Sequence, residues 1–440
     1  MSAMFFYRAS ILILAAALPL QAALAEQFNA CERAAIESLV EKNIITKDRA
    51  AELVKDYVRV EAKAPDTRKI KISGLAQIQY DWIYANTGEY DGVSSGFNLR
   101  KLFFGATSDI SDSFHATAIL DFRRTKTNGS DYIMDAFLTK DVDGDYLNGK
   151  FHLGIKKVAF CYEETIPTAN LSSVETSLAT AYFTGSQRNE SRLGFGQRYL
   201  GAFWNGSVRQ AKGLKYTLAI TNSINNAIYP EAHLSGKESN PAAKADFNYW
   251  LAVDYSAKIE EDHSLKFGVK SGYGPSANIV SNDKYGAIAA VNPFFEYKYK
   301  KQFVFWCEYL FANVQYGKAN GTQSACPQSY NVSAEYFFEA PLAPGKFGLY
   351  ARFCQLFTDG RGVAPTDMIQ FCKNVASAES NSVIYERGWS YYIGLNWYIM
   401  GDTLKIQAGY EHAKFEQAHN NLNLGDESID ILRAQVQVLF

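Results

Sequence analysis

The sequence predicts an all-β protein, a 16-stranded antiparallel transmembrane β-barrel with a short N-terminal periplasmic helical hairpin. Three observations support this prediction. The chain ends on a strand that alternates between apolar and polar residues, fifteen earlier segments alternate in the same way, and the links between the segments are short and long in turn. A period of two is typical of strands that have one apolar face and one polar face.

The final strand shows the alternation most clearly, because it continues to the last residue. Over residues 432–440, apolar residues alternate with Arg433, Gln435 and Gln437, and Leu439 is the one exception. An apolar face toward lipid and a polar face toward a wet interior are typical of a transmembrane barrel. Because a barrel with a polar interior is usually a pore, this strand also points to a class of function.

Sixteen such segments follow one another along the chain. In the first, residues 70–84, isoleucines and aromatic residues share one face, and Gln77, Gln79 and Asp81 lie on the other. The remaining strands are predicted at 97–109, 113–123, 131–140, 150–158, 192–205, 214–223, 246–258, 263–273, 288–299, 302–314, 329–339, 346–357, 388–399, 403–414 and 428–440. An even number of strands fits a barrel that one bacterial chain forms alone.

The links between these strands differ in length according to their position. Links from an even-numbered to an odd-numbered strand are mostly short turns, and the other links are long except 124–130. The long links are 85–96, 159–191, 224–245, 274–287, 315–328, 358–387 and 415–427. Short periplasmic turns and long external loops are the plan of outer-membrane barrels. The start of the first strand and the end of the last strand therefore both fall on the periplasmic side, as does the segment that precedes the barrel.

The N-terminal region differs from the rest of the chain. Arg8, an apolar stretch at 11–20 and the motif Ala23-Leu24-Ala25 together resemble a secretory signal peptide. Two amphipathic helical stripes follow it, separated near residue 44, and they predict a helical hairpin. The predicted parts of the chain are a signal peptide at 1–25, a periplasmic helical hairpin at 26–65 and a transmembrane β-barrel at 66–440.

Composition leaves a soluble alternative open. The mean hydropathy of −0.20 would suit a soluble exported β-protein. Against this, 14% of the residues are aromatic, as aromatic girdles at two membrane interfaces require. No apolar run after the signal peptide is long enough for a spanning helix, so a membrane protein of this sequence must be a closed barrel. The formal net charge of −2 argues against nucleic acid as a partner.

The sequence has no pattern typical of a catalytic or metal site. Its 6 cysteines lack C-x-x-C spacing, its 6 histidines form no H-x-x-x-H pair, and no G-x-S-x-G or phosphate-binding glycine motif occurs. We therefore expect no enzyme activity, no cofactor and no bound metal. Cys326 and Cys372 fall on long links of the same side, so they either form a disulfide in an oxidising compartment or remain free thiols.

Several motifs between residues 97 and 206 resemble those of a known family. Residues 97–101 resemble the F-x-L-R-R opening of the second strand in phosphate-selective porins of the O/P type. Further blocks in that family's order are 120–122, 134–137, 153–156, 163–164, 192–194 and 201–206. The resemblance implies a sixteen-stranded trimeric outer-membrane porin with an inward loop after the fifth strand. The long link 159–191 occupies that position.

The resemblance also implies that inward-facing basic residues line a narrow waist of the pore. Alternation places Lys156 opposite the face of Leu153 and Ile155, and it favours Arg100 over Lys101 as the inward residue of its strand. The predicted pore-lining residues are Arg100, Arg123, Asp135, Lys156, Lys266, Lys270, Arg352, Lys405 and Arg433.

The predicted inward loop departs from the family because it is acidic. The loop contains four glutamates, at 163, 164, 175 and 190, and one basic residue, Arg188. A positive potential concentrates anions in a cleft, and anion filters are built from arginine and lysine. An acidic loop would oppose that selectivity, so the sequence predicts a weakly selective pore with at most a mild preference for phosphate-like oxyanions.

We therefore expect a porin of the bacterial outer membrane through which small hydrophilic solutes diffuse. Its expected partners are two further copies in a homotrimer, outer-membrane lipid, the barrel-assembly machinery and small anions or other hydrophilic solutes. The aromatic C-terminus, Phe440, resembles the signal by which such barrels are recognised for insertion. The alternative is an envelope tether, in which the periplasmic hairpin contacts peptidoglycan or envelope proteins and the barrel serves as the anchor.

Overall fold

The computed structural model describes the barrel and leaves most of the N-terminal region undescribed. It covers Thr46 and residues 70–86, 91–122, 133–144, 147–185, 192–222, 246–281, 284–318, 321–341, 343–365, 384–418 and 426–440. The chain divides into two compact units, 1–68 and 69–440. The predicted signal peptide and helical hairpin lie outside the described residues, as do Arg123 and Cys372, so these predictions stay predictions.

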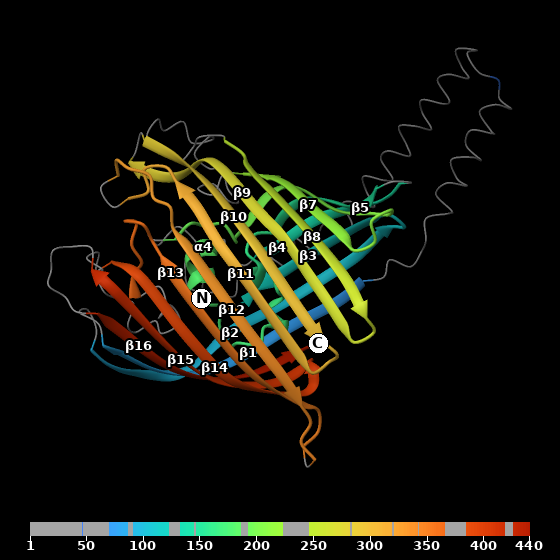
Figure 1. Cartoon of the computed structure of the whole chain (residues 1–440). Helices are drawn as coiled ribbons and strands as arrows, with labels where there is room; N and C mark the ends of the chain where they lie inside the picture. Colours follow the sequence, from blue (N-terminus) through green and yellow to red (C-terminus); the bar gives the residue numbers. More distant parts are fainter. Residues whose placement is uncertain are drawn as a thin grey trace, which may run out of the picture. The chain divides into compact units, whose positions relative to one another are not determined.

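The described part of the second unit forms a closed antiparallel barrel of sixteen strands, as predicted (Figure 1). Each strand pairs with its neighbours in sequence, and the ring closes between the first and the last strand. The strands are β1 Ile70–Asn86, β2 Asp91–Ser111, β3 Phe114–Asp121, β4 Ile133–Asp143, β5 Leu147–Lys157, β6 Arg198–Val208, β7 Leu214–Thr221, β8 Asn248–Glu260, β9 His263–Ser281, β10 Lys284–Tyr299, β11 Phe303–Val314, β12 Gln328–Phe338, β13 Lys346–Phe357, β14 Tyr385–Asp402, β15 Leu404–Ala418 and β16 Glu427–Leu439.

Side chains alternate between the two faces of the barrel wall as the sequence predicts. On β16, Arg433 and Gln435 point inward and are buried, while Leu432 and Val436 are 48% and 44% exposed on the outer face. On β1, Gln77 is buried on the inner face and donates a hydrogen bond to a partner on β16. The outer face is therefore apolar and suited to lipid, and the inner face is polar.

Two predicted long links are shorter than expected. The links 85–96 and 274–287 were expected as loops, but β1 and β2 continue to Asn86 and from Asp91, and β9 and β10 continue to Ser281 and from Lys284. Outside the lipid, strands can pair through their backbones without an apolar face. These stretches are accordingly rich in glycine, serine and asparagine. The apolar signal therefore ends before the strands do.

A β-bulge on β2 corrects the predicted direction of one side chain. Lys101 pairs with Gln77, whereas the next pair is Leu99 with Ile78, so Arg100 is the extra residue. Directly paired residues point to the same face, so Lys101 shares the inner face of Gln77. The prediction that Arg100 and Lys101 point in opposite directions is wrong, because the bulge interrupts the alternation between them.

The described part of the link after β5 lies inside the barrel, as the resemblance implied. This part, residues 158–185 and 192–197, is here called the inward loop and contains α3 Tyr162–Thr165, η2 Thr168–Asn170 and α4 Leu178–Thr184. Helix α4 packs on the inner face of β12, β13 and β14 (Figure 1). Its apolar side chains belong to the largest buried cluster of the described residues. Among the described residues, no helix is long and apolar enough to cross a membrane.

The C-terminal residue closes the seam between β16 and β1. The backbone N–H of Phe440 donates to the carbonyl oxygen of Gly74 at 2.9 Å, and the N–H of Gly74 donates back to Phe440 at 2.6 Å. The phenyl ring of Phe440 covers Gly74 so closely that a Cβ atom at this position would overlap it. Glycine is therefore required here for close approach rather than for backbone freedom.

Replacing Gly74 with valine is expected to displace the Phe440 ring and to open this end of the seam. Overpacking and the loss of two hydrogen bonds together should cost roughly 2–4 kcal/mol of unfolding free energy. The midpoint of urea unfolding, followed by the gel mobility of folded barrel, measures the effect. Gly96→Val on β2 is the matched control, because a Cβ atom there meets nothing within 4 Å. Equal midpoints for the two variants would contradict the seam assignment.

Candidate functional site

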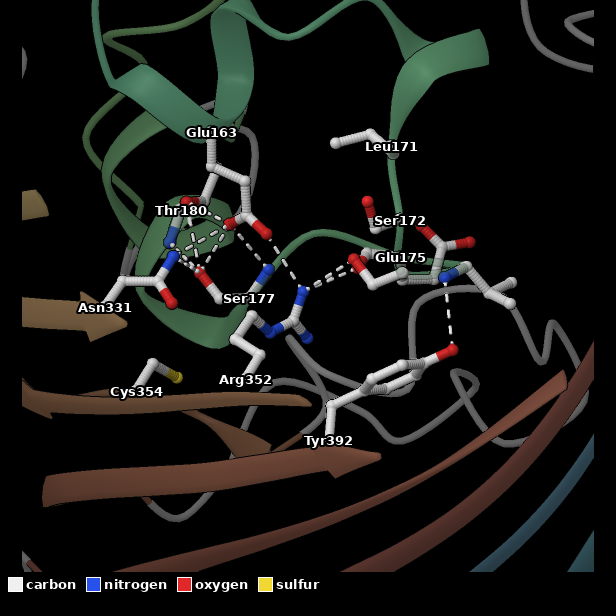
Figure 2. Close-up of polar contacts among 12 residues, drawn as sticks. Glu163, Leu171, Ser172, Glu175, Ser177, Thr180, Asn331, Arg352, Cys354 and Tyr392 are labelled. Carbon is white, nitrogen blue, oxygen red and sulfur yellow. Dashed lines mark hydrogen bonds and ion pairs between the residues drawn. The ribbon is translucent and has the colours of Figure 1, made fainter. Parts of the chain in front are cut away.

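One guanidinium group of the barrel wall binds the inward loop at several points. Arg352 on β13 donates from Nη1 to Glu163 Oε1 at 2.9 Å, to Ser173 Oγ at 3.0 Å and to the backbone oxygen of Glu175 at 2.8 Å. Its Nη2 atom donates to Glu411 Oε1 on β15 at 3.0 Å. Figure 2 shows the guanidinium between the loop and the strands below it. One wall residue thus fixes three separate points of the loop.

The Glu163 carboxylate that faces Arg352 is also the centre of the loop's internal hydrogen bonds. Its Oε2 atom accepts from the backbone N–H of Ser177 at 2.9 Å, from the Ser177 hydroxyl at 2.7 Å and from the Thr180 hydroxyl at 2.6 Å. Asn331 on β12 donates to the same oxygen at 3.1 Å. The Ser177 hydroxyl also accepts from the N–H of Thr180 and so caps α4. Glu163 therefore joins α3, α4 and the wall (Figure 2).

A second arginine holds the loop through a two-point contact. Arg100, the extra residue of the β2 bulge, donates from Nε and Nη2 to the two oxygens of Glu175 at 2.6 and 2.8 Å, and from Nη1 to Gln77 at 2.6 Å. Burial raises the pKa of the Glu175 carboxyl, but the charge and hydrogen bonds of Arg100, together with the charges of Arg433 and Lys101, lower it more. The pKa of Glu175 therefore lies below its ordinary value, and the pair is ionised at neutral pH.

A third arginine completes the network on the last strand. Arg433 lies 3.2 Å from Asp81 of β1 and 3.2 Å from the Oε2 atom of Glu411. Glu411 therefore bridges Arg433 and Arg352. All three arginines are almost fully buried, at 4%, 3% and 2% exposure for Arg100, Arg352 and Arg433. Buried charges remain ionised at low cost only when they are paired and hydrogen-bonded, and each of these is paired.

Amide and ammonium groups of β15 and β16 hold the middle of the loop. The ammonium of Lys405 donates to the carbonyl oxygen of Leu171 at 2.8 Å, and the amide of Gln407 donates to the same oxygen at 3.1 Å. The amide of Gln437 donates to the carbonyl oxygen of Ala169 at 3.0 Å. Lys405, predicted to line the pore, is fully buried beneath the loop.

Helix α3 is anchored through Tyr162 against β10 and β11. The backbone N–H of Tyr162 donates to Glu308 at 2.8 Å, and its hydroxyl donates to Glu296 at 2.6 Å. Burial, together with the nearby carboxylate, raises the pKa of the Tyr162 hydroxyl, so it remains a donor. Its ring stacks on Phe294 with centroids 4.4 Å apart and meets the edge of Trp306.

Two predicted pore-lining lysines of β9 lie beside this aromatic group. Lys270 is buried, lies 5.4 Å from the Tyr162 ring centroid and donates to the hydroxyl of Thr165. Lys266 keeps 32% of its side chain exposed and lies 3.6 Å from Asp254. Lys266 therefore faces the open lumen with a carboxylate beside it, whereas Lys270 serves the anchoring of α3.

Lys156 on β5 lies four strands from these lysines around the barrel and has a different environment. Its ammonium is 5.3 Å from the ring centroid of Phe137 and 5.9 Å from that of Phe203. The described residues give Lys156 no carboxylate within ion-pair distance, because Asp135 is bound by Arg198 at 2.9 Å. Among the predicted pore-lining residues that the structure describes, Lys156 thus combines partial exposure with the lack of an ion pair.

The acidic residues of the loop do not act as free negative charges. The sequence predicts that four glutamates of this loop oppose anions. Three of them lie in the described residues, and each has a basic partner. The pairs are Glu163 with Arg352, Glu164 with Lys157, and Glu175 with Arg100. Glu190 lies outside the described residues. The expected opposition therefore does not arise from these three carboxylates, because wall and strand-end cations neutralise them.

The closed barrel, its polar inner face and its inward loop define a class of protein, the outer-membrane porins. A family model described as phosphate-selective porin O and P matches residues 71–440, and the chain belongs to this family. The protein is a passive diffusion channel of the outer membrane, and its family and fold point to a channel rather than an enzyme. No curated protein sequence matches the chain.

Solved porin structures share the fold at low sequence identity. The anion-selective porin from Comamonas acidovorans is 9% identical, with a TM-score of 0.53, and the match covers 85% of this chain and 100% of that chain. OprB of Pseudomonas putida is 8% identical, with a TM-score of 0.53 and coverage of 88% and 97%. The channel DcaP of Acinetobacter baumannii is 11% identical, with a TM-score of 0.52 and coverage of 85% and 99%.

Loss of the Glu175 charge is expected to loosen the loop at neutral pH. Because the pKa of Glu175 is depressed, its ion pair stabilises the loop fully above the ordinary carboxyl pKa of about 4.3 and is lost as pH falls through the depressed value. Glu175→Gln leaves Arg100 buried without its anion, which should cost roughly 3–5 kcal/mol.

Single-channel conductance between pH 7 and pH 3 measures this effect. The Glu175→Gln variant should already show at pH 7 the altered conductance that wild type shows only in acid. Glu164→Gln is the control, because its pair with Lys157 lies at the start of the loop and is partly exposed. A Glu175→Gln channel with the wild-type pH profile would contradict the anchoring role.

Proposed function

We propose that this porin passes small hydrophilic anions, phosphate-like oxyanions among them, with a mild preference over cations. One observation supports this proposal above others: the described loop carboxylates are neutralised, whereas Lys156 on the facing wall has no ion pair among the described residues. The description of the family as phosphate-selective agrees with an anionic solute.

The physical basis of the preference is a positive charge whose electric field is weakly screened by its surroundings. The Lys156 ammonium lies beside two phenyl rings, and a low-dielectric wall extends the field of a charge into the lumen. The field attracts anions without trapping them, as conduction requires. The preference is mild because neighbouring charges form pairs, with Arg198 bound to Asp135 and Lys266 close to Asp254.

We further propose a homotrimer in the bacterial outer membrane. Support comes from the family and from the apolar outer faces of the strands, which suit both lipid and a neighbouring barrel. The barrel-assembly machinery is the proposed partner during insertion, with Phe440 as its signal. Native mass spectrometry of detergent-extracted protein tests the trimer, and a mass of one chain would contradict it.

Lys156→Ala is expected to reduce the anion preference by roughly two- to fivefold in permeability ratio, the effect of one unit charge in a wet lumen. The reversal potential in a potassium chloride gradient across a planar bilayer measures the ratio. Lys301→Ala is the control, because it removes a charge from the exposed turn between β10 and β11, where the described residues give Lys301 no ion pair, and it should leave the ratio unchanged. An unchanged reversal potential for Lys156→Ala would show that another group sets the preference.

A further inference from the structure

We propose that Arg352 determines the ion selectivity of the pore without lining the solute path. This inference rests on the proposed anion preference at Lys156 and adds a buried positioning residue on which that preference depends. Arg352 was expected to line the pore, yet it is 3% exposed beneath the inward loop. Its effect on a solute must therefore act through the groups that it holds.

The first role of Arg352 is to position the loop. Its Nη1 atom alone binds acceptors on residues 163, 173 and 175, which lie on two separate turns of the loop. The guanidinium also lies over the ring of Tyr392 at 5.4 Å, and the Tyr392 hydroxyl accepts from the N–H of Val174 at 3.4 Å. Figure 2 shows both wall residues directed at the same stretch of loop. A planar group with several donors can satisfy this set, whereas a lysine cannot.

The shape of the wall beneath Tyr392 supports a built site. The Tyr392 ring lies directly against Gly409 of the neighbouring strand β15, and a Cβ atom at Gly409 would overlap the ring and its hydroxyl. The glycine at position 409 thus leaves room for the ring of Tyr392, and the ring packs against the guanidinium of Arg352. Positions on two strands are therefore fitted to hold Arg352 at one height in the lumen.

The second role of Arg352 is to cancel charge. It is the cation bound to Glu163, whose other described partners are neutral hydroxyl, amide and backbone groups. Glu411 differs, because it also has Arg433 at 3.2 Å. Removal of the Arg352 charge therefore leaves Glu163 in the inward loop without a cationic partner. A net negative charge in the loop favours cations, so the anion preference at Lys156 also depends on this pair.

The decisive test compares Arg352→Gln with the double variant Arg352→Gln/Glu163→Gln in planar bilayers. Arg352→Gln should shift the permeability ratio toward cations by roughly two- to tenfold. The double variant removes both charges of the pair, and its ratio should return to near the wild-type value. Arg352→Lys keeps the charge without the planar group, so it should keep the ion preference while conductance changes.

The outcomes separate a charge effect from a merely structural one. Cation-shifted selectivity in Arg352→Gln that Glu163→Gln reverses supports the proposal. An unshifted ratio, or a shift that persists in the double variant, overturns it, because loop displacement alone would not respond to the second substitution. Should Arg352→Gln fail to assemble, the charge-balanced double variant and Glu163→Gln decide the matter, since Glu163→Gln alone must shift the ratio toward anions. A wild-type channel that prefers cations would refute the proposed function, yet the relative shifts would still test Arg352.

Discussion

The constraint on which this structure depends is that every backbone N–H and C=O group in lipid needs a partner within the protein. A sheet meets this need only when its first and last strands pair, and β1 pairs with β16 from Leu75 to Asn86. Closure then determines the rest, because side chains alternate between lipid and lumen along every strand. The polar inner face that results supplies the donors and acceptors that hold the inward loop.

The loop converts part of a wet lumen into a protein interior. Once it covers the inner face of β11 to β16, charged groups there lose their water, and an unpaired charge would cost several kcal/mol. This explains why Arg100, Arg352 and Arg433 are all paired with carboxylates and why Lys405 binds a loop carbonyl. The same residue types differ in use around the lumen. Cations under the loop hold its position, whereas Lys156, which has no ion pair among the described residues, is the cation that we propose acts on the solute.

The strands could be predicted from the sequence because apolar and polar residues alternate wherever one face of the wall contacts lipid. The face of Arg433 and Gln435 follows from that alternation alone. The ion pairs could not be predicted, since alternation says which face a residue shares but not which distant residue lies at the same height. Glu163 and Arg352 are 189 residues apart. The β2 bulge was hidden for a related reason, although its trace is visible in the mixed faces of residues 100–106. Glu308 and Asn331 were missed, although each is a polar residue on the inner face of its strand.

The acidic composition of the loop and a preference for anions are therefore compatible. A charged side chain that is neutralised by an ion-pair partner has little effect on a permeating ion. The described loop glutamates are the means by which the wall arginines hold the loop, so acidity here is a consequence of anchoring rather than a filter for cations. Charge counts along a porin loop thus misjudge selectivity whenever the loop is fastened by ion pairs. The charges that remain unpaired act on the solute, and we propose that Lys156 is the main one in the described part of the lumen.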